Sequence, residues 1–583
     1  MADFDRTVDV LIAGSGAAGL VAALAADSHG LSSLLVEKTD KIGGTSAYSG
    51  GGLWIPNNVV AQAAGLKDSF EEALTYMEDI IGDAGPASSK ERKLAFLREG
   101  PKMISFLVDL GFKWRRATGY SDYYPDRPGG KAEGRGIEPE VFDIKRLGEW
   151  RQHLRLSPLP PLPMYTNEAA AFALMIKTRK GFQTALRVGA RLVGRLLIGQ
   201  RPMTNGQSLV AQLLLLNLQR NLPIWRNSPL ADLIVEDGEV VGAVVEHDGR
   251  IVRVRATRGV VLTAGGFARN AEMRAKYQKA PTGAHWTSVP PDDKGDAICA
   301  GIKIGAATAL MDDAWWGPTL VDPATGQPSF ILWERSFPHS IIVDEAGERF
   351  MNESESYVDA GHQQYERNEI VKAIPAWLIV DSEHRRRYPM GTIPPGLTPR
   401  SALKSGFITK AGSLEELAQK IDVDPTGLRS TVERFNEMAI SGIDEDFGRG
   451  RTAYDNWYGD PSNTPNPNLG TIAKAPFYAL QIWPGDLGTK GGLLTDEFAR
   501  VLDERSQPIP GLYAAGNTTA SVMGRSYAGP GATIGPATTF AYIAVNHLAD
   551  GRSTLADVPS DGRSRSAEGP RGSAHGAVVV RTS

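Results

Sequence analysis

The 583-residue chain carries 63 Lys and Arg against 67 Asp and Glu, a formal net charge of -4, and 42% of its residues are hydrophobic. A chain this long exceeds the roughly 250–300 residues that one core serves, so we expect a globular protein of two or three domains. The near-neutral balance excludes a global field that favours nucleic acid, and a single cysteine, Cys299, excludes an intrachain disulfide or a cysteine-based metal cluster. No metal site is predicted.

The first ten residues, MADFDRTVDV, lack the basic region and the apolar region of a secretory signal. The sequence also has no uninterrupted apolar run of about 18 residues, so no transmembrane helix is expected. A cytoplasmic location follows as the expectation.

The first predicted element is a strand, a glycine turn and an alanine-rich helix, VDVLIAGSGAAGLVAALAA from Val8. Its glycines have the G-x-G-x-x-G spacing, and a second apolar run, SSLLVEK, reaches an acid where a ribose hydroxyl is bound in dinucleotide folds. A G-x-G-x-x-G alone is weak, but the strand, the helix and the acid favour dinucleotide binding over a structural glycine turn. The residues expected at the dinucleotide are Gly14, Gly16, Ala17, Ala18, Gly19, Glu37 and Lys38.

A long loop of small and hydroxyl residues, KIGGTSAYSGGGLWIPNN, follows directly and can wrap an extended cofactor beyond its pyrophosphate. Two later segments, GVVLTAGGFARN and IPGLYAAGN, again place glycines after an apolar strand. We expect these three segments to contact the cofactor through Gly43, Gly44, Thr45, Ser46, Ser49, Gly50, Gly51, Ala264, Gly265, Gly266, Gly516 and Asn517.

The segment from Ala169 to Arg201 contains seven Lys and Arg and no Asp or Glu. Arg187, Arg191 and Arg195 recur every four residues and so share one face of a predicted helix, with Leu and Val on another face. A basic amphipathic helix of this kind is typical of a membrane-surface anchor whose arginines face anionic lipid. The alternative is a helix packed on the protein, or on a second subunit.

The remaining pattern predicts the domain organisation. A β-meander is expected from Pro229 to Ala256, where residues alternate with period two around EDGE and HDGR turns. An aromatic-rich stretch then indicates an inserted domain. We predict a first part of the cofactor domain at 1–283, a substrate domain at 284–481, a second part of the cofactor domain at 482–551, and a disordered Ser/Gly/Arg-rich tail at 552–583.

The stretch GRSYAGPGATIGPATTF, from Gly524 to Phe540, places a tyrosine beside a glycine cluster at the start of a predicted helix. Bare backbone N–H groups at a helix start attract negative charge. The stretch can therefore hold an oxygen that becomes anionic. An ordinary glycine-rich turn before a core helix explains the same residues without a ligand.

Together the glycine fingerprint, GGTSAYSGG, TAGGF, GLYAAGN, DYYP, NESESYVD, GDLGTKGG and SYAGPGATIG resemble flavoproteins of the succinate dehydrogenase/fumarate reductase superfamily. More narrowly they resemble 3-ketosteroid Δ1-dehydrogenases, over most of the chain from about Val8 to about Leu548. The resemblance implies an α/β fold, with a Rossmann-like FAD-binding domain and an inserted α+β substrate domain. It implies non-covalent FAD, because the N-terminal flavin loop has no matching histidine.

The resemblance also implies the reaction, in which a 3-keto-4-ene steroid loses a proton from C2 and a hydride from C1 to flavin N5, giving a 1,4-diene in steroid degradation. It assigns Tyr357 as the base and Tyr123 as its hydrogen-bonding helper, although the neighbouring Tyr124 can exchange roles with Tyr123. It places Tyr527 and the Gly531 N–H on the C3 oxygen. The turn Ala532, Thr533 and Ile534 is expected at the flavin pyrimidine ring, and Phe330, Trp333 and Trp316 are expected as pocket walls or as core.

Three other functions compete with this one. A dicarboxylate reductase needs cationic clamps, for which Arg335, His339 and His362 exist. A Δ4-(5α) steroid dehydrogenase shares the expected fold, and a non-catalytic flavin-binding membrane protein leaves the tyrosines idle. For the favoured reaction the expected partners are the steroid, an electron acceptor such as a quinone or an artificial dye, and a membrane surface at 169–201; no nucleic acid is expected.

Overall fold

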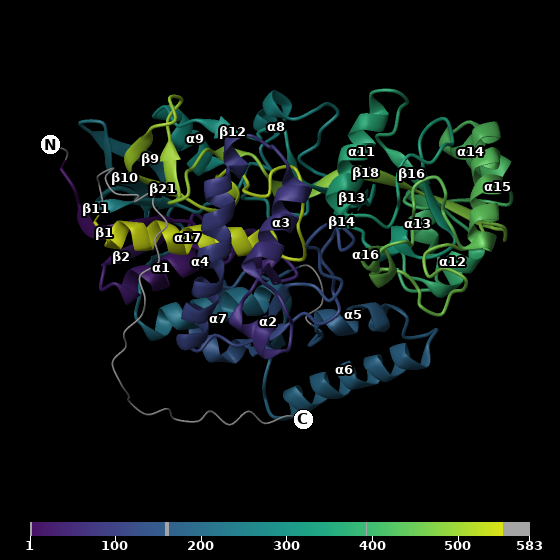
Figure 1. Ribbon diagram of the computed structural model, residues 1–583, viewed down its shortest axis with the longest axis horizontal. Coiled ribbons are helices and arrows are strands. Elements are labelled where there is room, and N and C mark those ends of the chain that lie inside the picture. Colours follow the sequence, from purple (N-terminus) through teal and green to yellow (C-terminus); the bar gives the residue numbers. More distant parts are fainter. Residues whose placement is uncertain (1–2, 158–161, 392, 552–583) are drawn as a thin grey trace. The chain divides into compact units, whose positions relative to one another are not determined.

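Five parallel strands form the centre of the larger sheet in the computed structural model, which describes residues 3–157, 162–391 and 393–551 (Figure 1). The strand order is β20-β21-β11-β1-β2-β8, with β10 and β9 continuing antiparallel from β11. Strands β21, β11, β1, β2 and β8 pair in parallel. The strands are β1 (Arg6–Ala13), β2 (Ser33–Val36), β8 (Ile224–Trp225), β9 (Leu230–Glu236), β10 (Glu239–His247), β11 (Arg250–Leu262), β20 (Arg500–Leu502) and β21 (Pro508–Ala514).

The fold class predicted from the sequence is confirmed, because the first strand, glycine turn and helix form β1 and α1 (Ala17–Ser28) as expected. Alanines keep α1 thin, and its first ten residues are buried. Helix α1 packs between the sheet, α17 (Ile534–Ala549) and α7 (Asn205–Gln219). This packing brings the start of the last described helix beside the first glycine turn.

The β-meander runs through β9, β10 and the first half of β11. Both of its turns have two consecutive residues at positive φ, Asp237–Gly238 and Asp248–Gly249, as two-residue hairpins require. Strand β11 then pairs in parallel with β1, so the meander is continuous with the main sheet.

A second sheet has the order β14-β13-β18-β16-β15, with β17 on β18, and all of its pairs are antiparallel (Figure 1). Residues 1–551 group as one compact unit, so the internal domain limits at 283 and 481 stay predictions. The predicted tail at 552–583 lies outside the described residues. The strands of this sheet are β13 (Ala314–Val321), β14 (Pro328–Phe330), β15 (Ser340–Val343), β16 (Ala376–Val380), β17 (Thr409–Ala411) and β18 (Phe477–Thr489).

Short strands and the other helices complete the chain. The short strands are β3 (Leu53–Trp54), β4 (Trp114–Arg116), β5 (Gly136–Pro139), β6 (Phe142–Asp143), β7 (Pro202–Met203), β12 (Thr308–Ala309) and β19 (Gly492–Leu493). The 3₁₀ segments are η1 (Gly44–Ala47), η2 (Pro86–Ser88), η3 (Ile144–His153) and η4 (Gly516–Thr518). The helices are α2 (Val59–Ala63), α3 (Phe70–Ile81), α4 (Lys90–Asp109), α8 (Ala271–Tyr277), α9 (Asp296–Lys303), α10 (Trp333–Ser336), α11 (Tyr357–Asn368), α12 (Ser382–Arg387), α13 (Arg400–Lys404), α14 (Leu414–Ile421), α15 (Pro425–Ser441) and α16 (Ala453–Trp457).

The basic segment forms α5 (Thr166–Ala173) and α6 (Arg179–Leu197), but its arginines do not form one free row. Arg191 makes a two-pronged ion pair with Glu168, at 2.7 Å for each of the two contacts, and Arg195 donates to Gln200. The predicted outward-facing row holds only for Arg187, which is exposed, because a carboxylate on α5 binds the central member, Arg191. The side chains that α6 exposes are largely apolar instead. Among the described helices, none is long and apolar enough to cross a membrane.

Candidate active site

The parallel strands β1, β2, β11 and β21 end at one edge of the main sheet, because parallel neighbours point the same way. The loop after each strand carries residues predicted to bind the cofactor. The site thus forms where ligands bind in open α/β sheets, outside the carboxyl ends of the strands.

Two glycines of the first turn are required by the protein itself. Gly14 has φ +106°, and a side chain on Gly19 would meet the Gly14 carbonyl oxygen at 1.9 Å. Gly16 is different, since the nearest atom to an added Cβ is Ser46 Oγ at an ordinary 3.5 Å. A glycine at position 16 is instead explained by the close approach of a ligand, as a pyrophosphate requires.

Glu37 lies buried at the end of β2, as the ribose-binding acid is expected to lie. One of its oxygens accepts from the Ser15 hydroxyl at 2.6 Å, and the other accepts from the Thr39 N–H and hydroxyl at 3.0 Å each. The Ser15 N–H adds a fourth bond at 3.2 Å. A carboxylate has about four acceptor sites, so these bonds fix the orientation of Glu37, and a ribose hydroxyl would have to share or replace one of them. The neighbouring Lys38 pairs with Asp296 at 2.6 Å.

The loop of small residues closes over the first turn. Ser46 in η1 accepts from the Ala17 N–H at 3.1 Å, which joins the loop to the start of α1. Ser49 donates to the Ser46 carbonyl and accepts from the Gly51 N–H. Thr45 lies in η1 beside Ser46, and added side chains on Gly43 and Gly51 would strike Val210 and Asn205. An added Cβ on Gly44 or Gly50 would meet nothing within 4 Å, which leaves this side of the loop open.

The two later glycine segments join the same edge. Gly265 and Gly266 follow Ala264 after β11, and the Gly265 carbonyl accepts from Thr518 at 3.0 Å. Gly516 and Asn517 begin η4 after β21, and an added Cβ on Gly516 would lie 3.5 Å from Ala537 and 4.0 Å from Ala18. These contacts place η4 between the starts of α1 and α17.

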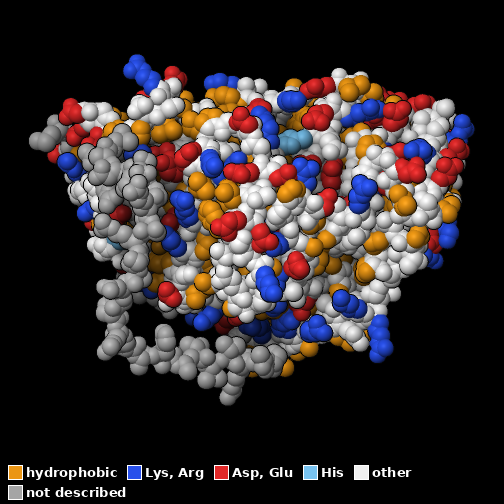
Figure 2. All heavy atoms as spheres, viewed as in Figure 1, with side chains coloured by type: hydrophobic (Ala, Val, Ile, Leu, Met, Phe, Trp, Pro, Cys, Tyr) orange, Lys and Arg blue, Asp and Glu red, His pale blue; other side chains and the backbone are white. Residues whose placement is uncertain are grey.

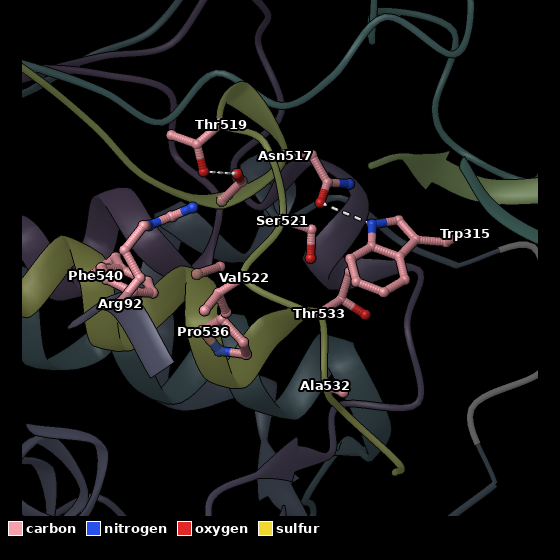
Figure 3. Close-up of a pocket in the computed structure, with 12 residues that line it drawn as sticks. Arg92, Trp315, Asn517, Thr519, Ser521, Val522, Ala532, Thr533, Pro536 and Phe540 are labelled. Carbon is pink, nitrogen blue, oxygen red and sulfur yellow. Dashed lines mark hydrogen bonds between the residues drawn. The ribbon is translucent and has the colours of Figure 1, made fainter. Parts of the chain in front are cut away.

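A small pocket lies where η4 meets the start of α17 (Figure 3). Its wall includes Trp315, whose indole N–H donates to Asn517 at 3.1 Å, and Arg92 with Phe540 on the other side. Ala532 and Thr533 line it at the N-terminus of α17, where helix N–H groups have no intrahelical partner. This end of the pocket favours negative charge, as the predicted position for the flavin pyrimidine ring requires.

The three predicted catalytic tyrosines come together. Tyr123 donates to the Tyr357 hydroxyl at 3.2 Å, and its ring stacks on Tyr527 with centroids 4.9 Å apart. The Tyr357 and Tyr527 rings meet edge-on at 5.1 Å. All three side chains are at most 5% exposed, although they come from a loop, from the start of α11 and from the stretch before α17.

Burial sets the ionisation of this cluster. It raises the pKa of Tyr357 well above its ordinary value, and the hydrogen bond from Tyr123 opposes the rise. Burial also raises the pKa of Tyr527, against hydrogen bonds from Thr533, Tyr357 and the Gly531 N–H. The Gly531 N–H and the Tyr527 hydroxyl thus lie beside each other next to Tyr357.

Strand β3 and the residue before it explain the glycines in the turn that precedes α17. Gly531 has φ +94°, and an added Cβ would lie 2.2 Å from the Gly52 carbonyl oxygen. The close contact that requires a glycine at position 531 is therefore with the backbone before β3. The turn is anchored at Ala528, whose carbonyl accepts from the Tyr123 N–H at 3.1 Å and the Tyr76 hydroxyl at 2.7 Å.

Of the other predicted site residues, Phe330 contacts the three tyrosines, whereas Tyr124, Trp333 and Trp316 make their contacts elsewhere. Tyr124 donates to Asp359 at 3.1 Å, so Tyr123, not Tyr124, contacts Tyr357. Phe330 packs edge-on against Tyr357 at 5.1 Å. Trp333 contacts Tyr458 rather than the three tyrosines, and Trp316 packs on Tyr365 in a separate core cluster.

Sequence reasoning missed two residues beside the cluster. Trp315 meets the Tyr527 ring edge-on at 5.1 Å, and the buried Lys490 lies over the Trp315 ring and donates to the Ser526 carbonyl at 3.1 Å. Burial lowers the pKa of Lys490 to about 8. Lys490 lies in the motif GDLGTKGG, and Trp315 lies in the aromatic-rich stretch DDAWWGP, where strand alternation separates the two neighbouring tryptophans.

The residues of a dicarboxylate clamp are engaged elsewhere. Arg335 is fully buried and donates to the Glu353 and Glu355 carbonyls at 2.5 and 2.8 Å. His362 bonds to Asp313, and His339 bonds to the Thr471 carbonyl. These contacts orient the three side chains toward the protein rather than toward a common ligand. Within the described part of the chain, no cluster of His, Cys, Asp or Glu side chains is placed to hold a metal ion.

Comparison with known proteins agrees with this geometry. The FAD binding domain family matches residues 9–534. A 3-oxosteroid 1-dehydrogenase of Mycolicibacterium smegmatis is 45% identical over 93% of this chain and 97% of its own, and one of Mycobacterium tuberculosis is 45% identical over 93% and 98%. The chain belongs to the 3-oxosteroid 1-dehydrogenase family. A solved 3-ketosteroid Δ1-dehydrogenase from Sterolibacterium denitrificans, in complex with 1,4-androstadiene-3,17-dione, has a TM-score of 0.89 and 40% identity, over 94% of this chain and all of that one.

Membership of the 3-oxosteroid 1-dehydrogenase family confirms FAD as the cofactor. The residues present fit it, because Gly16 leaves room at the pyrophosphate position, Glu37 is oriented at the ribose position, and the α17 N-terminus lines the pocket.

Proposed function

We propose that the protein catalyses the 1,2-dehydrogenation of 3-ketosteroids, converting a 3-keto-4-ene to a 3-keto-1,4-diene in steroid degradation. The observation that carries this proposal is the convergence of Tyr357, Tyr123, Tyr527 and the Gly531 N–H in one buried cluster. A ketone with acidic neighbouring protons needs a base and two oxyanion donors close together, and this cluster supplies both. The names of the relatives support the same substrate class.

Each residue has a distinct task. Tyr357 takes the proton from C2, and Tyr123 stabilises the phenolate form of Tyr357 through the hydrogen bond that it already donates. Tyr527 and the Gly531 N–H donate to the C3 oxygen, on which charge develops as the proton leaves. When bound, FAD supplies the two-electron acceptor for the hydride of C1, and the residues 532–534 favour the negative charge that follows.

We further propose that FAD is held without a covalent bond, since the loop from Gly43 to Gly51, which closes on the first turn, contains no histidine. A quinone, or a dye in the assay, reoxidises it. The bonds that hold Arg335, His339 and His362 to the protein weigh against dicarboxylate reduction at this site.

Anaerobic mixing of the purified holoenzyme with 4-androstene-3,17-dione tests the proposed reaction. We expect the flavin absorbance to bleach and a product that lacks two hydrogens, with the new double bond at C1–C2. Acid treatment of the same sample should release FAD into the supernatant. Bleaching by succinate, or oxidation of a 5α-saturated 3-ketosteroid to the 4-ene in preference, contradicts the assignment.

We also propose that α6 attaches the protein peripherally to the inner face of the cell membrane. Its exposed apolar side chains include Phe182 at 58%, Leu186 at 58% and Leu197 at 82%. Arg179, Lys180 and Arg187 are exposed on the same helix, and Figure 2 shows Lys and Arg beside hydrophobic side chains where Figure 1 places α6. An anionic lipid surface satisfies both kinds of side chain, because apolar residues enter the headgroup boundary while cations meet phosphate.

Vesicle sedimentation measures this attachment. The wild-type protein should sediment with vesicles of phosphatidylcholine and phosphatidylglycerol at low salt, and less so at high salt. The change Leu186→Glu with Leu197→Glu should leave it in the supernatant, since fully burying each leucine is worth about 1.5–3 kcal/mol. The pair Ile370→Glu and Ile440→Glu, equally exposed elsewhere, is the matched control. Equal loss in both pairs, or no vesicle binding by the wild type, refutes the attachment.

A further inference from the structure

Four tyrosine hydroxyls form one continuous line that ends at Tyr357. Tyr123 donates to Tyr357 at 3.2 Å, the Tyr120 hydroxyl lies 3.1 Å from that of Tyr123, and the Tyr458 hydroxyl bonds to that of Tyr120. Tyr120 and Tyr458 are 8% and 2% exposed. The hydrogen bonds of the Tyr357 hydroxyl therefore extend past Tyr123 to two further buried tyrosines.

The direction of every bond in this line follows from counting protons. A phenol has one proton to donate. The proton of Tyr123 goes to Tyr357, so Tyr120 is the donor in its bond to Tyr123. The proton of Tyr120 is then used, so Tyr458 is the donor in its bond to Tyr120. All three bonds consequently point toward the oxygen of Tyr357.

Aromatic packing holds the two outer members in place. Tyr120 stacks on Trp457 with centroids 5.2 Å apart and meets Tyr458 at an interplanar angle of 88°. Tyr458 directly follows α16 and meets Trp333 edge-on at 5.2 Å. Trp333, which the sequence analysis expected as a pocket wall or as core, therefore packs against the outer tyrosine of the line.

We propose that Tyr120 and Tyr458 are positioning residues that stabilise the ionised form of the Tyr357 base through Tyr123. Hydrogen bonds in a low-dielectric interior polarise one another, so a line of donors with one direction strengthens the last bond, the one to the phenolate. Neither residue has to touch substrate. The inference rests on the proposed function, because it needs Tyr357 as the base.

The test compares the pH dependence of flavin bleaching by 4-androstene-3,17-dione in anaerobic stopped flow, between pH 6 and pH 10. For Tyr458→Phe we expect the rising limb of the profile to move about one unit to higher pH, which is about a tenfold lower rate at pH 7. Because the raised pKa of Tyr357 lies above this range, both profiles should rise in parallel, and the steroid dissociation constant should stay unchanged. Tyr120→Phe should shift the limb at least as far, because it breaks the line closer to the base.

Tyr365→Phe is the matched control, because this buried tyrosine lies on α11 but donates to the Pro281 carbonyl, outside the line. An unchanged rate, or a lower rate accompanied by weaker binding of the steroid, overturns the proposal. If Tyr458→Phe fails to hold FAD, Tyr120→Phe decides alone. Failure of the proposed function is distinguishable, since the wild-type flavin then does not bleach with steroid or Tyr357→Phe keeps the wild-type rate.

Discussion

Replacement of Tyr357 by phenylalanine is expected to lower the rate of flavin bleaching by steroid about a hundred- to ten-thousand-fold, the usual contribution of a general base. The ring contacts with Tyr527 and Phe330 do not need the hydroxyl, so FAD and steroid affinity should be retained. Anaerobic stopped flow measures the rate, and titration of the flavin spectrum with the 1,4-diene product measures affinity. A Tyr357→Phe rate within a few-fold of wild type removes Tyr357 from the mechanism.

The pH dependence supplies the second half of this test. Burial raises the pKa of Tyr357, so the neutral phenol dominates at neutral pH and the phenolate that accepts the proton is the minor form. The rate should therefore rise about tenfold per pH unit from neutral pH upward. Tyr357→Phe should lose this slope, while Tyr365→Phe on the same helix should keep both slope and rate.

The cofactor half of the site is predictable from short segments. A strand, a glycine turn and a helix define β1 and α1 locally, and hydrophobic runs ending in glycines define the strands that meet the same edge. The reason lies in parallel pairing, since any strand added in parallel brings its loop to the edge where Gly16 already lies. The sequence therefore predicts that the glycine segments at Gly14, Gly265 and Gly516 lie at one edge of the sheet.

The catalytic half depends on contacts between distant segments. Tyr123, Tyr357 and Tyr527 share no local pattern, and only the family resemblance selects them among 16 tyrosines. Gly531 stays a predicted donor to the C3 oxygen, and the backbone before β3 that excludes a side chain at this position lies 479 residues earlier in the chain.

Contacts with residues far away in the sequence also explain where the structure differs from the sequence-based prediction for the basic helix and where it extends the tyrosine cluster. A helical wheel shows Arg187, Arg191 and Arg195 on one face, yet Glu168 on another helix turns Arg191 toward the protein. The extension from Tyr123 to Tyr458 likewise requires α16 to pack on the loop after β4. Neither contact leaves a periodic signal in the sequence, whereas the alternation that separates Trp315 from Trp316 does.

Replacement of Tyr527 by phenylalanine is expected to lower the bleaching rate about a hundred- to a thousand-fold, as the loss of one oxyanion donor does elsewhere. Tyr527 → Phe keeps the ring contacts with Tyr123 and Trp315, and Gly531 keeps its N–H, so the pocket should retain its shape. The substitution removes the hydroxyl that donates to the C3 oxygen. This hydrogen bond is strongest when the C3 oxygen becomes anionic. The rate should fall further than affinity, because the developing charge strengthens the missing bond.

The matched comparison uses two ligands rather than two proteins. Wild-type protein should bind a 3-keto steroid more tightly than its 3-deoxy analogue, and Tyr527→Phe should reduce this preference by weakening only the keto ligand. Flavin absorbance changes on titration report both affinities. The Thr533 hydroxyl, 2.9 Å from that of Tyr527, is the neighbour available to substitute for the lost donor, so Tyr527→Phe combined with Thr533→Val should lose more than Tyr527→Phe alone. An unchanged preference between the two ligands in Tyr527→Phe shows that the C3 oxygen lies elsewhere.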